Sequence, residues 1–199
     1  MKPHQHFVVH KPYGVLSITH KPPHQQSKKD LSTLFPFPEG VHPIGRLDED
    51  SEGLLLMTSN SKLMAYVNGA KFEKEYYVQL DGDITQEAIE LMLAGLTLRI
   101  KQELVQTKPC LVKKLVEIPL FEPRIPPSRA GKHRPASWIS VCIREGKFRQ
   151  VRKMTAAVGF PTLRLIRVRI DNIKLGNLKV GEVQSLPEII PFFLPPLHE

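Results

Sequence analysis

Four acidic side chains crowd the short stretch GRLDEDSEGLLLM, which ends in an apolar run. Asp48, Asp50 and Glu52 occupy alternate positions ahead of Gly53, which is the spacing of carboxylate ligands in a calcium loop. A calcium loop that began at Asp48 would need a bidentate Glu at its twelfth position, where this chain has Ser59. Calcium binding is therefore a poor interpretation, and the carboxylates need another chemical role.

Positive charge is concentrated in one segment of a chain whose formal net charge is +8. Between Arg124 and Arg169 the sequence holds 12 Lys and Arg but only one acid, Glu145. This segment therefore carries +11, and the rest of the chain sums to −3. Such a concentration is typical of a surface for a polyanion, most often nucleic acid, although any single cation could belong to a solvated face.

One predicted helix would present part of this charge. Val151 and Met154 are spaced to face the core in a helix over residues 150–158, which Gly159 would end. The surrounding charge favours a phosphate-binding helix over a merely solvated one. Its cations, which are neighbours at a spacing of three or four residues, are Arg149, Arg152 and Lys153.

The elements that must position these groups are short strands and a few helices. The apolar patterns predict strands over residues 7–10, 54–58, 76–80, 138–144 and 163–170, with further strands within 104–118. They predict helices over 61–67, 85–94 and 150–158, and a proline-rich basic loop over 120–135. We therefore expect an α+β fold with a mixed, mainly antiparallel sheet flanked by helices and loops.

Length and composition are those of an ordinary globular protein. A chain of 199 residues with 41% hydrophobic and 24% charged residues can bury a core, as one domain or as two small lobes. The apolar run 54–57 is far too short for a membrane span, and the start MKPHQHFVVHK is too polar for a signal peptide. The sequence predicts a cytoplasmic protein with no membrane partner and no obligatory protein partner.

Four ordered motifs give the acidic stretch a specific context. GRLDEDSEGLLLMT is similar to the GRLDxxSxGLLLxT signature of the RsuA-type pseudouridine synthases, and KPYG at 11–14 resembles their opening KPxG. The KEY triplet at 74–76 and EGKFRQVRKM at 145–154 resemble two further motifs of this family, in the same order. The resemblance spans most of residues 7–185, and four ordered motifs are far more specific than GRLD alone.

The resemblance implies a fold and a domain composition. It implies the pseudouridine synthase catalytic fold, as a single catalytic domain over residues 1–199 or as two sub-lobes of it. Many members carry an N-terminal S4-type RNA-binding domain, and a small domain needs about 50 residues. Because this chain has far fewer residues before its first predicted strand, we expect the compact subgroup that has no S4 domain.

The implied activity is isomerisation of a specific uridine in ribosomal RNA, expected to be the large-subunit (23S) RNA, to pseudouridine. The family implies that Asp48 is the catalytic carboxylate, acting at the sugar or the base of the uridine. The C1′–N1 bond breaks, the uracil rotates and C1′ joins C5, so neither a cofactor nor a metal is expected. Asp50 and Glu52 are expected to be solvated or to pair with Arg46.

The family also implies roles for residues of the other motifs. A nearby guanidinium would keep the catalytic Asp ionised, and Arg152 is the expected partner, with Arg149 as the alternative. Tyr76 would pack on the flipped uracil and remove the proton from C5, whereas Tyr77 is expected to be an ordinary strand aromatic. The cations expected to contact RNA are Lys11, Arg46, Lys74, Arg129, Lys132, Arg134, Lys147, Arg149, Lys153 and Arg164.

A non-catalytic RNA-binding protein, such as a ribosome-associated factor, is the main alternative. It would explain the positive charge equally well. It would not explain why an acidic Arg-Leu-Asp turn accompanies that charge. The sequence leaves open whether naked RNA or an assembling large subunit is the substrate.

Overall fold

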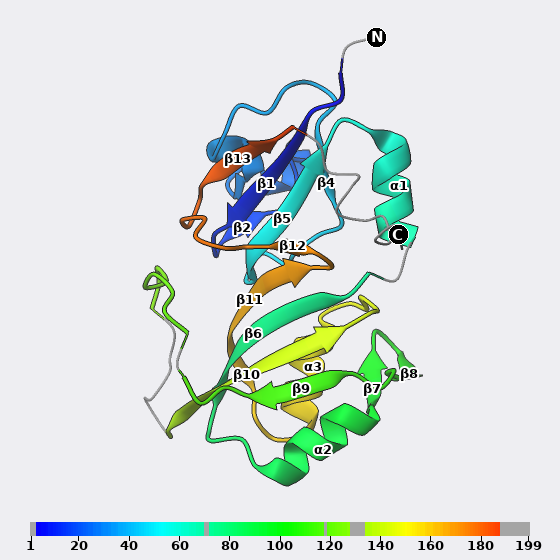
Figure 1. The fold of residues 1–199 in the computed structure, drawn as a ribbon, viewed down its shortest axis with the longest axis vertical. Helices are drawn as coiled ribbons and strands as arrows, with labels where there is room; N and C mark the ends of the chain where they lie inside the picture. The colour runs from blue at the N-terminus through cyan, green and yellow to red at the C-terminus, as the bar shows by residue number, and fades with distance from the viewer. Residues whose placement is uncertain (1–2, 70–71, 118, 128–133, 188–199) are drawn as a thin grey trace, which may run out of the picture. The chain divides into compact units, whose positions relative to one another are not determined.

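The computed structural model describes residues 3–69, 72–117, 119–127 and 134–187, and the chain divides into two compact units (Figure 1). Unit 1 combines Met1–Phe72 with Arg167–Glu199, and unit 2 comprises Glu73–Ile166. Strand β11 (Thr162–Ile170) runs from unit 2 into unit 1.

The regular elements of unit 1 are mostly short strands. They are β1 (His6–Lys11), β2 (Val15–Leu16), β3 (Lys29–Asp30), β4 (His42–Ile44), β5 (Glu52–Thr58), α1 (Ser61–Gly69), β12 (Ile173–Lys174) and β13 (Val183–Leu186), with 3-10 turns at Pro23–Gln25 and Leu31–Thr33. The strand order is β13-β1-β5-β11, with β4 paired to β5 and β12 to β11. Strand β1 is antiparallel to both β13 and β5, whereas β2 and β3 form a separate parallel pair.

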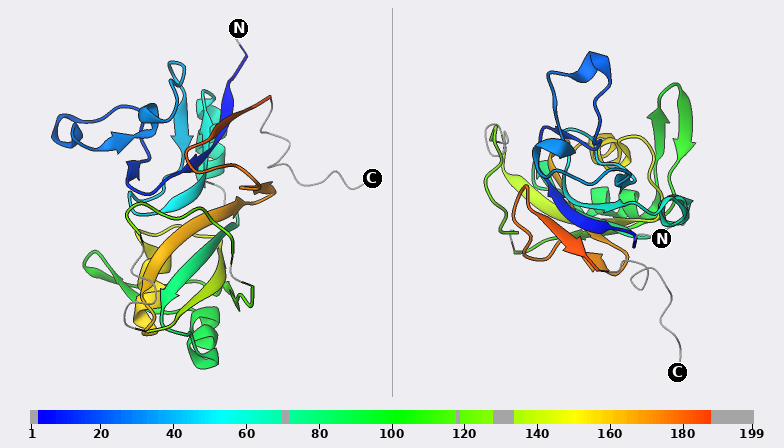
Figure 2. Two further views of the ribbon diagram at one scale, coloured as in Figure 1. Left: turned by 90° about the vertical axis from the view of Figure 1, so that its left-hand side faces the viewer. Right: turned by 90° about the horizontal axis from the view of Figure 1, so that it is seen from above.

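The core of unit 1 forms where β1 and β5 face the long segment between β1 and β4. Phe7 lies opposite Met57 and Val9 opposite Leu55, and these four share one face because side chains alternate along a strand. They are buried together with residues from the segment that connects β1 to β4, which lies on one side of these strands (blue in Figure 2). Those residues are Val15, Leu31 and Val41.

Unit 2 combines strands with two helices. Its elements are β6 (Lys74–Asp81), α2 (Gln86–Ala94), β7 (Thr97–Ile100), β8 (Glu103–Gln106), β9 (Leu111–Lys114), β10 (Ala136–Ile143), α3 (Gln150–Ala157) and the first part of β11. The strand order is β11-β6-β10-β9, with β10 antiparallel to β6 and β9, and β7 and β8 form an antiparallel hairpin. None of the helices within the described ranges is both long and apolar enough to cross a membrane.

The predicted α+β fold with a mainly antiparallel sheet is confirmed. Strands β1, β5, β6 and β10 and all three predicted helices lie where the sequence patterns placed them. Thr85, the first residue of the predicted helix, caps α2, because its hydroxyl accepts a hydrogen bond from the backbone N–H of Ala88 (3.3 Å). The pattern missed β2, β3, β4, β7, β12 and β13, each of which has four residues or fewer.

We predict that Gly53→Ala destabilises unit 1 by about 2 kcal/mol or more. Gly53 has a φ of +102°, and a Cβ there would lie 2.3 Å from the backbone oxygen of Arg167 on β11. Urea unfolding of both proteins would measure the loss. Gly69→Ala is the matched control, since a Cβ at Gly69 meets nothing within 4 Å. Equal stabilities for Gly53→Ala and the parent would contradict the prediction.

Candidate active site and nucleic-acid interface

The acidic loop of unit 1 is fixed by its backbone on both sides of Asp48. Before it, the Ser17 hydroxyl donates to the carbonyl oxygen of Leu47 (2.7 Å) and accepts from the Leu47 N–H (3.1 Å). After it, the Gly14 N–H donates to the carbonyl oxygen of Glu49 (2.8 Å). The loop then closes with a bond from the Ser51 N–H to the Asp48 carbonyl (3.0 Å). The carboxylate of Asp48, a half-buried residue, is therefore carried on a rigid backbone.

A fully buried lysine is hydrogen-bonded to the same loop. Lys11 ends β1 opposite Gly53, and its ammonium donates to the carbonyls of Pro12 (2.9 Å), Val15 (2.6 Å) and Glu49 (3.4 Å). Burial lowers the pKa of Lys11 to about 8, although the charges of the loop acids act in the opposite direction. Those acids are, from the largest effect to the smallest, Glu52, Asp50, Glu49 and Asp48.

Two expectations for this loop are wrong. Lys11 was expected to contact RNA, but it is 0% exposed and its three N–H groups point at backbone carbonyls of the loops. Glu52 was expected to be solvated or paired with the exposed Arg46, but it is buried (1% exposed) and its charge acts on Lys11. In both cases the sequence showed the charge but not the fold that buries it.

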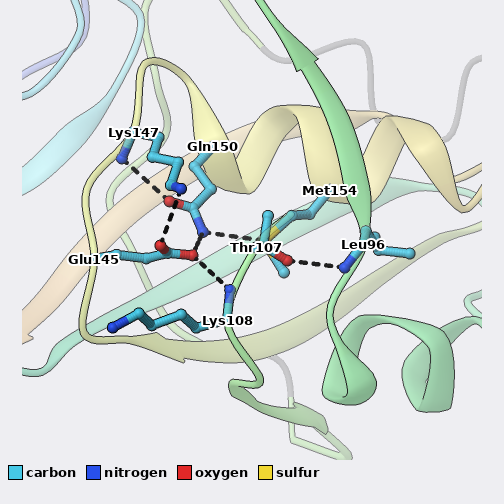
Figure 3. Close-up of polar contacts among 7 residues, drawn as sticks. All are labelled: Leu96, Thr107, Lys108, Glu145, Lys147, Gln150 and Met154. Atoms are coloured by element: carbon cyan, nitrogen blue, oxygen red, sulfur yellow. Dashed lines mark hydrogen bonds and ion pairs between the residues drawn. The ribbon is translucent and has the colours of Figure 1, made fainter. Parts of the chain in front are cut away.

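In unit 2 the EGKFRQ motif forms a turn between β10 and α3 that is held from within (Figure 3). Glu145 accepts hydrogen bonds from the Gln150 side chain (2.6 Å) and from the backbone N–H of Lys108 (2.9 Å). The Gln150 amide oxygen in turn accepts from the Lys147 N–H (3.1 Å), and the Lys147 ammonium lies 3.5 Å from the Glu145 carboxylate. Arg149 leaves the turn with left-handed backbone angles (φ 52°, ψ 34°) and precedes α3.

The other residues expected at the site lie in unit 2. Tyr76 lies on β6 opposite Val141 of β10 and is buried, with 8% of its surface exposed. Arg152, on α3, is half-buried. Tyr77 has the ordinary strand role expected of it, because its ring packs edge-on against Phe121 (centroids 6.2 Å apart).

The basic segment is not uniformly a surface. Arg164 was expected to contact RNA, but it is buried (7% exposed) with its guanidinium 5.6 Å from the ring centroid of Phe121. Arg134 is exposed and pairs with Asp81 (3.2 Å). Arg129 and Lys132, which were also expected to contact RNA, lie outside the described residues. Four further expected contacts, all half-buried, are Lys74, Lys147, Arg149 and Lys153.

The groups that hold the candidate residues in place could not be recognised from the sequence. Ser17, whose hydroxyl bonds both the N–H and the carbonyl of Leu47, lies in a stretch whose sequence pattern does not indicate a structural role. Glu145 and Gln150 were visible as motif letters, but only the structure shows that they bond to each other. Within the described ranges, no group of three or more His, Cys, Asp or Glu side chains is placed to hold a metal ion.

Comparison with known sequences gives a consistent result. The family model for RNA pseudouridylate synthase matches residues 5–157. The chain is 40% identical over 180 residues to ribosomal large subunit pseudouridine synthase E of Xanthomonas campestris, covering 88% of this chain and 91% of that protein. It is 36% identical to the protein of the same name from Vibrio parahaemolyticus, covering 90% and 72%. It is 31% identical to the dual-specificity RNA pseudouridine synthase RluF of Escherichia coli, covering 93% and 56%.

Solved structures agree on the fold. A crystal structure of a pseudouridylate synthase superposes with a TM-score of 0.73 at 24% identity, covering 94% of this chain and 71% of that one. Human RNA pseudouridylate synthase domain containing 1 superposes with a TM-score of 0.55 at 19% identity, covering 100% and 84%. At these identities the likeness concerns the fold alone.

We predict that the stability contributed by Lys11 rises with pH. Because its pKa is about 8 in the fold and 10.5 for an unperturbed lysine, the unfolded chain binds more protons between these values, so folding becomes more favourable as pH increases. Urea unfolding of the parent and of Lys11→Met at pH 7 and pH 9.5 would measure this. The parent should gain about 1–2 kcal/mol relative to the variant over this interval. A difference that does not change with pH would contradict the lowered pKa.

Proposed function

Because this chain belongs to the RNA pseudouridylate synthase family, we propose that it converts a specific uridine of large-subunit (23S) ribosomal RNA to pseudouridine. The structural observation that best supports this is the acidic loop, in which the backbone is fixed on both sides of Asp48. A carboxylate that must act at one defined atom of a nucleotide requires such a rigid support. The names of the relatives support the substrate class.

The proposed reaction is an isomerisation with a closed balance. The C1′–N1 bond of the uridine breaks, the uracil rotates, and a bond forms between C1′ and C5. The proton of C5 is lost and N1 gains one, so no oxidant, reductant or second substrate is consumed. The target base must leave its stack to react, at a cost of a few kcal/mol, which binding to the RNA backbone can offset.

We assign the catalytic roles to Asp48, Tyr76 and Arg152. Asp48 acts on the target nucleotide, Tyr76 packs on the uracil and removes the C5 proton, and Arg152 supports the chemical step, with Arg149 as the alternative. The proposed RNA contacts are those expected cations that the described structure leaves at least partly exposed: Arg46, Lys74, Arg134, Lys147, Arg149 and Lys153. Naked ribosomal RNA or an assembling large subunit in the cytoplasm would supply the substrate.

Asp48→Asn should reduce turnover by roughly three orders of magnitude or more, on the scale of catalytic-group removal in other enzymes. An amide cannot act as the nucleophile or the base, but it keeps the size of the side chain. Pseudouridine formation in ribosomal RNA from cells that lack this protein would be followed by chemical mapping. Asp50→Asn, in the same loop, is the matched control and should remain active. Near-normal turnover by Asp48→Asn would exclude the proposed role.

Arg152→Ala should reduce the single-turnover rate at saturating enzyme far more than it reduces RNA affinity. Lys153→Ala, on the same helix, should do the opposite, because we assign it to phosphate. Its loss should also flatten the dependence of log affinity on log salt by about 0.7 for a single strand. If Arg152→Ala changes only affinity, Arg152 is a phosphate contact and the catalytic role passes to Arg149.

A further inference from the structure

Phe148 is a large aromatic side chain that is exposed to solvent. It is 57% exposed in the turn between β10 and α3, and its neighbours in the sequence are the cations Lys147 and Arg149. A phenyl ring left in water forfeits the stabilisation that burial would give. An exposed ring at this position therefore fits a ligand better than it fits the packing of the fold.

The turn that carries Phe148 is preorganised. Glu145 and Gln150, on either side of it, are joined by a hydrogen bond of 2.6 Å, and the Lys147 N–H is bound to the Gln150 amide oxygen (Figure 3). A further bond runs from the Gln150 N–H to the Lys147 carbonyl (3.1 Å). Because the backbone on both sides of Phe148 is already ordered, a ligand that stacks on the ring pays little additional conformational entropy.

The charge around Phe148 indicates the kind of ligand. The side chain of Arg144, which starts the turn, is 71% exposed although its guanidinium lies 3.6 Å from the Glu73 carboxylate, and Lys147 precedes the ring directly. The acid within the turn, Glu145, has only 14% of its side chain exposed. An aromatic ring near the exposed Arg144 and beside the half-buried Lys147 and Arg149 matches an unpaired nucleotide, whose base stacks on the ring while its phosphates meet the cations. An apolar protein partner would gain nothing from those charges.

The turn also lies at a defined end of the unit 2 strands. It follows Ile143, the last residue of β10, which pairs with Lys74 at the start of β6. Tyr76 lies two residues further along β6. Phe148 is thus carried at the strand end where the residue assigned to the target uracil also lies.

We propose that Phe148 is a stacking platform for an unpaired base that flanks the target uridine. This rests on the proposed function, since it assumes that the substrate is RNA with an unpaired target region. Stacking on a phenyl ring is tolerant of sequence, so Phe148 would orient the strand rather than select the base. The role is separate from that of Tyr76, which we assign to the target base itself.

The first test uses the full-length protein and a single-stranded oligouridylate of roughly 12 nucleotides, within the usual site size. Phe148→Ala should weaken binding about 5- to 100-fold, the range for loss of one base–aromatic stack. Phe148→Tyr and Phe148→Trp should bind like the parent, whereas Phe148→Leu, which is apolar but not aromatic, should resemble Ala. Leu91→Ala is the control, because Leu91 is an apolar residue of unit 2 with similar exposure (55%). Unfolding in urea would verify that all the variants fold.

A second test locates the stacked base. Abasic nucleotides would be placed one at a time beside the mapped uridine of a substrate RNA. At one position the missing base should weaken binding of the RNA to the parent protein. At that same position it should not weaken binding to Phe148→Ala any further. Equal affinity of Phe148→Ala and the parent for both RNAs would overturn the proposal, as would Phe148→Leu binding like the parent. A parent protein that makes no pseudouridine in any ribosomal RNA would instead contradict the proposed function, while the oligouridylate result would still decide the role of Phe148.

Discussion

A lysine ammonium with no surface exposed to water lies beneath the acidic loop of unit 1. Removing an ammonium from water costs several kcal/mol unless its protons find acceptors and its charge finds opposite charge. Lys11 has both, because three loop carbonyls accept its protons and four acids of the loop surround it electrostatically. The KPYG turn and the GRLDED stretch therefore depend on each other. The acidic loop supplies negative charge and a carbonyl acceptor for the buried Lys11 ammonium, and Lys11 supplies a donor and a positive charge for the loop.

In unit 2 the charged group removed from water is a carboxylate instead of an ammonium, and it too has hydrogen-bonding partners. The largely buried carboxylate of Glu145 is satisfied by the backbone N–H of Lys108 and by the Gln150 amide, and Gln150 returns a hydrogen bond to the turn. In both motifs, residues with a proposed chemical role stand beside residues that only hold the backbone. This explains why each motif is several residues long although few of them would touch RNA. A rigid support is what allows a side chain to act at one atom.

The sequence was informative where patterns are local. Strands β1, β5 and β10 and helix α3 follow from alternation or helical spacing, and the four ordered motifs identify the family. What could not be predicted depends on contacts between distant segments. Lys11 and Arg164 look like surface cations in the sequence, since Lys and Arg are rarely buried, and only the packing of other strands and loops encloses them. The short strands β12 and β13 likewise exist because long neighbours offer them hydrogen-bonding partners.

The burial of individual cations also changes what the +11 segment can do. Arg164 and Arg167 are buried, and Arg167 donates from Nε to the Leu54 carbonyl on β5 (2.8 Å). The Arg124 guanidinium donates to the carbonyls of Pro126, Pro127 and Leu163. Arg164 and Arg167 are enclosed by the fold, so they cannot neutralise phosphates and release counterions when RNA binds. The salt dependence of RNA binding should therefore correspond to fewer phosphate contacts than the 12 cations of the segment. Stacking of a base on an exposed aromatic ring can add affinity to what the remaining cations supply.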